Sequence, residues 1–329
     1  MQRRLTVLTL VAALAAALGL LPLAPAVRAD HSATSIVWDD FQAGFSATGP
    51  GAKWFYFNAG PFVGDDGIAT TSGAGLRVRA SGTNPRSGLP AFTKTLGQEQ
   101  ENGGIPGGVD HVKWLVYANH RSSSGVPGFD AVPGKEVACE ARFGGQAFGT
   151  REHPFRSHVR NAEDDLRLAS VALNTLDFES FLVFDFFLTN QRVYAFYERL
   201  PFGRTPDHNY AAFSYGIPVA PRTPGVDHQL AIALDTSAGV VRWLLDGREV
   251  FRVGNLGKRL PDRPFRQFLT IDHGGTEELV APRQLVSARA DAIQVNPIHR
   301  LPAERTVGKM QRAMCQNMSR AQAAPPPAD

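Results

Sequence analysis

The sequence predicts an all-β protein built of antiparallel strands, and three observations lead to this fold class. From residue 36 to about residue 295, short apolar or alternating runs are separated by clusters of Gly, Pro, Asn and Asp. The runs are rich in Val, Phe, Tyr and Trp, which favour strands. No long segment between them has the apolar spacing of a helix.

The expected strands lie between turn residues and are either apolar throughout or alternate in polarity, as buried and half-buried strands do. The strongest turn signal is Asp246-Gly247, because both positions of a two-residue hairpin turn need a positive φ. The expected strands cover residues 75–80, 111–120, 137–143, 165–173, 181–188, 193–199, 210–217, 228–234, 240–245 and 249–253.

Residues 1–29 have the layout of a secretory signal peptide. Arg3 and Arg4 precede an apolar run over residues 5–23, and Val27 and Ala29 occupy the small-residue positions of a cleavage site. A retained membrane anchor is the alternative, because about 20 apolar residues can span a bilayer. The cleavage motif favours removal, so we expect a secreted, extracellular protein.

Removal of the signal would leave a chain without net charge. The full chain has 34 Lys and Arg against 31 Asp and Glu, and three of its arginines lie in the signal, which leaves 31 of each sign. We therefore expect no nucleic-acid partner, because such binding needs a basic surface. No later apolar segment is long enough for a membrane span.

We expect a β-sandwich domain over residues 30–300 and a different tail over residues 301–329. Val307, Met310, Met314 and Met318 recur at helical spacing and predict a short C-terminal helix that docks on the sandwich. A partner-binding tail is the alternative. The final APPPAD is expected to be disordered.

The two cysteines leave two alternatives open. Cys139 and Cys315 could form one disulfide in an oxidising compartment. Cys139 also shares its alternation with Val137, Ala141 and Phe143, which is typical of a core strand, where cysteine behaves as a small apolar residue. The second interpretation is favoured.

Two resemblances extend this prediction. The segment HQLAIALDTSAGVVRWLLDGREVFRV resembles the strand–strand–hairpin unit of concanavalin A-like lectins and laminarinase-type glucanases. The stretches DHVKWLVYANH, PGFDAVPGKEVACEA, VFDFFLTN and VYAFYERLPFGR are similar to an uncharacterised family of secreted actinobacterial proteins. The resemblances imply a concanavalin A-like antiparallel β-sandwich, a jelly roll, and export, but no activity.

The glucanase active-site pattern is missing. Laminarinase-type glucanases carry their catalytic acids in an E-x-D-x-E run, and no such run occurs here. Glu179 and Asp185 lie six residues apart, roughly 20 Å along a strand, which is too far for a glycosidase pair. The resemblance to glucanases therefore implies no glucanase activity for this chain.

A hairpin over residues 181–199 instead brings other carboxylates together. If residues 189–192 turn the chain, Asp185 pairs with Phe196, and Asp185 and Glu198 become diagonal neighbours about 7–8 Å apart at Cα. We take these two as candidate catalytic residues. The same face would carry the candidate substrate-binding residues Glu179, Phe187, Tyr194 and Phe196. A solvated sheet face with salt-bridged acids is the alternative.

The strand over residues 111–120 offers further candidates. His111, Tyr117 and Asn119 lie opposite its apolar side chains and could bind sugar hydroxyls or transfer protons. An ordinary exposed face is the alternative, and it is favoured.

No cofactor is expected. Asp39-Asp40 and Asp65-Asp66 could bind a structural calcium ion, but turn-forming aspartates are the favoured interpretation. The sequence thus predicts a secreted β-sandwich protein that binds, or alternatively cleaves, an extracellular polysaccharide or cell-wall glycan. If it is an enzyme, it is a glycoside hydrolase or polysaccharide lyase. The alternative is a non-catalytic cell-envelope structural or protein-interaction domain.

Overall fold

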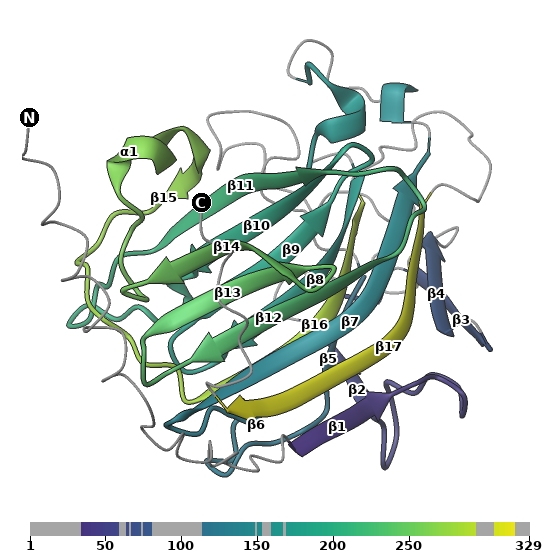
Figure 1. The fold of residues 1–329 in the computed structure, drawn as a ribbon, viewed down its shortest axis with the longest axis horizontal. Coiled ribbons are helices and arrows are strands. Elements are labelled where there is room, and N and C mark those ends of the chain that lie inside the picture. The colour runs from purple at the N-terminus through teal and green to yellow at the C-terminus, as the bar shows by residue number, and fades with distance from the viewer. Residues whose placement is uncertain are drawn as a thin grey trace, which may run out of the picture. The chain divides into compact units, whose positions relative to one another are not determined.

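Two antiparallel sheets make up the part of the chain that the structure, a computed structural model, describes (Figure 1). The described residues are 34–58, 64–65, 67–73, 75–80, 114–148, 150–152, 159–166, 169–293 and 306–319. The expected signal peptide, the candidate His111 and the final APPPAD lie outside them.

Sheet A has eight strands and sheet B has nine. The order in sheet A is β14 (Arg248–Gly254), β13 (Val240–Leu245), β12 (His228–Asp235), β7 (Lys135–Ala147), β17 (Thr306–Ser319), β4 (Gly75–Ala80) and β3 (Gly67–Ser72), and β1 (Thr34–Asp39) also pairs with β17. The order in sheet B is β15 (Leu269–Asp272), β11 (Phe213–Pro221), β10 (Arg192–Arg199), β9 (Leu182–Leu188), β8 (Ala169–Asp177), β16 (Gln284–Ile293), β5 (Trp114–Ala118) and β2 (Trp54–Tyr56), and β6 (Phe129–Asp130) also pairs with β16.

Helical structure among the described residues is confined to single turns. They are α1 (Asp262–Phe265) and the 3₁₀ turns Thr150–Glu152, Ala162–Asp164, Pro201–Gly203 and Arg266–Phe268. No helix in the described part of the chain is long and apolar enough to cross a bilayer. The predicted all-β sandwich is confirmed.

The core lies between the two sheets and takes alternate side chains from each. From β9 and β10 it takes seven residues: Leu182, Phe184, Phe186, Leu188, Val193, Ala195 and Tyr197. From sheet A it takes, among others, Cys139, Ile232 and Trp243. The alternation predicted for residues 182–197 is confirmed, because these side chains are all buried between the layers.

The predicted hairpins also form as expected. In β9 and β10, Leu188 pairs with Val193 and Asp185 with Phe196. The turn between β13 and β14 has Asp246 at φ 50° and Gly247 at φ 80°, the conformation that made this dipeptide a turn signal.

The predicted C-terminal helix is wrong. Residues 306–319 form β17, which pairs with β7 on one side and with β4 and β1 on the other. Hydrogen bonding on both edges and a place inside a sheet outweigh a weak helical apolar stripe, since tertiary context overrides local propensity.

The favoured interpretation of Cys139 as an unpaired core thiol is wrong as well. Cys139 lies in the core as expected, but it is disulfide-bonded. Cys315 is the only other cysteine of the chain, and its backbone lies directly opposite Cys139 in the pairing of β7 with β17. The disulfide therefore ties the C-terminal strand to the middle of sheet A.

Candidate functional site

The candidate site lies on the face of sheet B that points away from sheet A. Because paired residues in neighbouring strands share a face, one row of positions crosses seven strands. In order across the sheet the row is Gly216, Phe196, Asp185, Asn174, Ala288, Tyr117 and Phe55, on β11, β10, β9, β8, β16, β5 and β2. Glu198 lies in the adjacent row, paired with Val183.

Asp185 is held by hydrogen bonds on both carboxylate oxygens. The Asn174 side-chain amide donates to Oδ2 at 2.8 Å, and the backbone N–H of Thr175 donates to Oδ1 at 3.1 Å. Tyr117 donates its hydroxyl proton to Asn174 Oδ1 at 2.7 Å. A hydrogen-bonded chain thus runs from β5 over β16 to β8 and β9.

This part of the face is buried. The exposed fraction is 1% for Asp185, 3% for Tyr117 and 9% for Glu198. A second apolar cluster surrounds these groups, with Leu115, Ala172, Leu176, Val183, Phe187 and Val286 buried in it. Exposure rises toward β10, where Tyr194 and Phe196 are half-buried.

Burial and charge together set the proton affinities of the site. Loss of solvent, followed by the charge of Glu198, raises the pKa of the Asp185 carboxyl well above its usual value, against the two hydrogen bonds that lower it. Burial and the charges of Asp185 and Glu198 likewise raise the pKa of Tyr117. Asp185 therefore favours its protonated form next to Glu198, and Tyr117 keeps its hydroxyl proton.

Aromatic rings line the β10 side of the site. The rings of Phe187 and Phe196 lie 4.6 Å apart between centroids. Phe196 covers Gly216 of β11, where an added Cβ would lie 2.8 Å from the ring. A glycine at this position therefore makes room for the tip of the Phe196 ring beside the neighbouring strand.

The structure brings some of the predicted site residues together and separates others. Five of the predicted site residues lie on the same face of sheet B and interact with one another. They are Asp185, Glu198, Phe187, Phe196 and Tyr117. Tyr194 is on the same face but further along β10, where burial, followed by the charge of Asp164, raises its pKa to about 12.

Glu179 and Asn119 lie elsewhere. Glu179 is in the turn between β8 and β9, not on the strand, and forms an ion pair with Arg283, whose Nε lies 3.0 Å from it. Asn119 follows β5 and donates its side-chain amide to the carbonyl of Ala52 at 2.8 Å. Both side chains therefore already have protein partners outside the row.

Asn174 and Thr175 are the residues that the sequence-based prediction missed. Asn174 interrupts the apolar alternation of Ala172 and Leu176, and a lone amide at an apolar position of a buried strand requires hydrogen-bond partners. This break in the apolar pattern is the sequence feature that points to Asn174. Their partner Asp185 became apparent only with the pairing of β8 and β9.

Of the aspartates considered as calcium ligands, Asp66 lies outside the described residues, and Asp39 and Asp40 accept hydrogen bonds within a turn. Asp39 accepts from the backbone N–H of Phe41 and from Trp54 Nε1 at 2.9 and 2.7 Å, and Lys53 lies 3.3 Å from it. Among the described residues, no group of three His, Cys, Asp or Glu side chains is placed to hold a metal ion.

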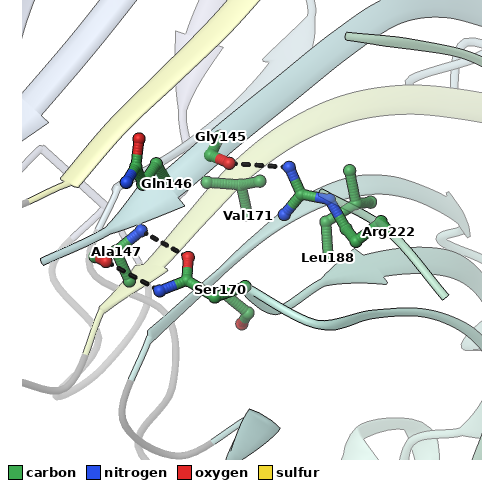
Figure 2. Close-up of a pocket in the computed structure, with 8 residues that line it drawn as sticks. Gly145, Gln146, Ala147, Ser170, Val171, Leu188 and Arg222 are labelled. Atoms are coloured by element: carbon green, nitrogen blue, oxygen red, sulfur yellow. Dashed lines mark hydrogen bonds between the residues drawn. The ribbon is translucent and has the colours of Figure 1, made fainter. Parts of the chain in front are cut away.

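Two hollows elsewhere contain none of the predicted site residues. Figure 2 shows a narrow gap beside β7 and β8, too small to hold a water molecule, where Arg222 donates to the carbonyl of Gly145 at 2.7 Å. An open hollow of about 490 Å³ is lined by Asp130 at the end of β6 and by loop residues that include Thr236 and Arg283.

Several known proteins are similar to this chain. Uncharacterized protein L829 of Acanthamoeba polyphaga mimivirus is 32% identical over 279 residues, which cover 67% of this chain and 57% of that protein. The chain thus spans little more than half the length of this curated relative.

Three solved structures that match most of this chain are 10–12% identical to it, so the likeness concerns the fold alone. An alginate lyase from Corynebacterium sp. has a TM-score of 0.39, with 79% of this chain and 83% of that chain covered. LamAcat from Zobellia galactanivorans has a TM-score of 0.45, with 87% and 96% covered. An endo-1,3-β-glucanase from Streptomyces sioyaensis has a TM-score of 0.39, with 83% and 100% covered.

The family assignment comes from sequence. A family model described as a family of unknown function, DUF6081, matches residues 38–289, which include both sheets except β17, most of β1 and the end of β16. The chain belongs to this family of unknown function.

Proposed function

We propose that the protein binds an extracellular polysaccharide on the outer face of sheet B, and that Asp185 and Glu198 form an acid/base pair there. One observation carries this proposal. Two carboxyl groups on neighbouring strands share a face, and the charge of Glu198 raises the pKa of Asp185. Pairs of acids whose surroundings separate their proton affinities are typical of acid/base sites.

The two acids take different roles in this proposal. Asp185, the more deeply buried, keeps a proton and acts as the general acid. Glu198, closer to solvent on β10, stays ionised and acts as the base or nucleophile. A glycan would approach from the β10 side, where the half-buried Phe196 and Tyr194 offer rings to sugar C–H faces.

A second function, a non-catalytic domain of the cell envelope, is favoured by a different observation. Asp185 is 1% exposed, and both of its oxygens already accept hydrogen bonds from β8. Buried, fully satisfied polar groups can serve to fix a strand register. In that case, the face would contact no sugar.

Export forms part of the proposal. The disulfide at Cys139 supports it, because disulfides persist in oxidising compartments. The signal-like residues 1–29 support it from sequence. Secretion by the native host and mass spectrometry of the mature amino terminus would test it, and a protein that stays inside the cell with residues 1–29 attached would contradict it.

The functional experiment is a glycan array and a reducing-sugar screen on the purified mature protein. Asp185→Asn and Glu198→Gln are the test variants. Glu140→Gln is the matched control, since Glu140 lies on the outer face of sheet A, where it accepts from Gln229 at 2.7 Å. Thermal melting verifies that each variant is folded.

Three outcomes separate the hypotheses. Loss of turnover by about 100-fold or more in both test variants, with glycan binding kept and the control unchanged, supports catalysis. Glycan binding without turnover, weakened by Phe196→Ala, supports binding alone. Silence of the wild-type protein in both assays removes the polysaccharide function and leaves the structural one.

A further inference from the structure

The hydrogen-bonded chain beside Asp185 has a direction that its end groups impose. Tyr117 donates to Asn174 Oδ1 at 2.7 Å, and Asn174 Nδ2 donates to Asp185 Oδ2 at 2.8 Å. β16 lies between β5 and β8, and its residue at the paired position is Ala288. The Tyr117 hydroxyl therefore reaches its partner across an intervening strand.

An asparagine amide has one donor end and one acceptor end, so it can take either of two orientations. In the orientation seen, both oxygens of Asp185 face N–H donors, from Asn174 and Thr175. In the flipped orientation, Asn174 would present its oxygen to Asp185 and would accept a proton from a protonated carboxyl. The two orientations thus give Asp185 opposite hydrogen-bond environments.

We propose that Tyr117 is a positioning residue that holds the Asn174 amide with its N–H groups toward Asp185. The phenol is 3% exposed, and the structure gives its proton one acceptor, Asn174 Oδ1. Flipping the amide would leave a buried hydroxyl proton without that acceptor, which is unfavourable. The raised pKa of Tyr117 supports this role, because the phenol stays a donor.

This orientation determines where the acid proton can go. Asn174 and Thr175 on β8 offer Asp185 only donors, so the β8 side provides no acceptor. On the β10 side lies Glu198, whose charge reaches Asp185. Among the described titratable groups, Glu198 from β10 acts on the pKa of Asp185, and both carboxyl groups act on the pKa of Tyr117 from β5. Tyr117 thus directs the Asp185 proton toward β10, the half-buried side of the face.

A role of Tyr117 in catalysis rests on the proposed function, whereas its effect on the titration of Asp185 can be measured without a substrate. The experiment is an NMR titration of the Asp185 carboxyl carbon in the labelled full-length mature protein. Tyr117→Phe should let the Asn174 amide turn, remove a donor from ionised Asp185, and raise its midpoint by about one pH unit. The Asn174 side-chain amide resonances should shift as well.

Tyr194→Phe is the matched control, because it removes a phenol from the same face at a site beside Asp164, away from Asn174. Tyr194→Phe should leave the titration midpoint of Asp185 unchanged. An unchanged midpoint and unchanged Asn174 resonances in Tyr117→Phe would overturn the proposal.

A second variant separates action through Asn174 from a direct effect of the phenol. In an Asn174→Ala background, Tyr117→Phe should no longer move the Asp185 midpoint, and a shift of the original size there would overturn the proposal. If Tyr117→Phe does not fold, Asn174→Ala alone must raise the titration midpoint of Asp185. An unchanged midpoint would overturn the proposal. If the wild-type protein neither binds nor cleaves a glycan, but Tyr117→Phe still shifts the Asp185 midpoint, the proposed function is wrong and the positioning role of Tyr117 stands.

Discussion

Trp243 of sheet A donates a hydrogen bond from Nε1 to the backbone carbonyl of Asp185 in sheet B, at 2.8 Å and fully buried. The bond spans the core and fixes the strand that carries the central acid of the candidate site. The ring also packs edge-to-face against Phe184, with centroids 5.9 Å apart. The position of Asp185 therefore depends on both layers of the sandwich.

Trp243→Phe should lower the free energy of unfolding by about 2–4 kcal/mol, because it leaves a cavity and a buried carbonyl without its side-chain partner. Denaturant unfolding measures the loss. Trp38→Phe is the control, since Trp38 is half-buried and its Nε1 bonds the Lys53 carbonyl nearer the surface. Equal losses in both variants would contradict a special role for the bond across the core.

The raised pKa of Asp185 predicts a specific pH dependence of stability. The folded state holds a proton on Asp185 that the unfolded chain releases above about pH 4. Its contribution is therefore complete below pH 4 and decreases by up to about 1.4 kcal/mol per pH unit as pH rises toward the folded pKa.

Comparison with Asp185→Asn isolates the titration of Asp185 and its coupling to Glu198, because carboxyl groups that do not interact with Asp185 cancel in the difference. The wild-type free energy of unfolding minus that of the variant should fall as pH rises above about 4. Chemical unfolding at a series of pH values measures it. A difference that stays constant with pH would show that Asp185 titrates normally.

The disulfide predicts a redox-dependent stability. Replacing Cys139 and Cys315 together by alanine should cost about 2–5 kcal/mol, because the bridge ties the last described strand to β7. A reductant should lower the unfolding midpoint of the wild-type protein and leave the double variant unaffected. A wild-type protein that is equally stable with and without reductant would contradict the assignment.

Tyrosine ionisation tests the burial of the site independently. Burial raises the pKa of five of the six tyrosines: Tyr56, Tyr117, Tyr194, Tyr197 and Tyr215. Ultraviolet titration of the folded protein should therefore show most of the phenolate absorbance only well above pH 10, the ordinary midpoint. Full ionisation near pH 10 without unfolding would mean that the face around Tyr117 is open.

The sequence was sufficient to predict the local features of β9 and β10. Alternation of Phe184 and Phe186 with Asp185 assigns the two faces, and a short turn sets the register that pairs Asp185 with Phe196. Both follow from the period of two in a strand, which acts over a few residues.

The surroundings of that hairpin could not be predicted in the same way. Tyr117 and Asn174 are 57 residues apart in sequence, and they meet because β16, from the end of the domain, lies between their strands. The burial of Asp185 depends on this long-range pairing. The same is true of β17, whose helical spacing was a local signal that pairing with β7 outweighed.

Asp185 and Glu198 share one face of sheet B, and the charge of Glu198 raises the pKa of Asp185. Carboxyl-carbon NMR titration of the labelled wild-type protein tests it most directly. We expect the Asp185 midpoint to lie well above its ordinary value and to fall when Glu198→Gln removes the neighbouring charge. An Asp185 carboxyl that ionises near about pH 4 and is unaffected by Glu198→Gln would contradict this.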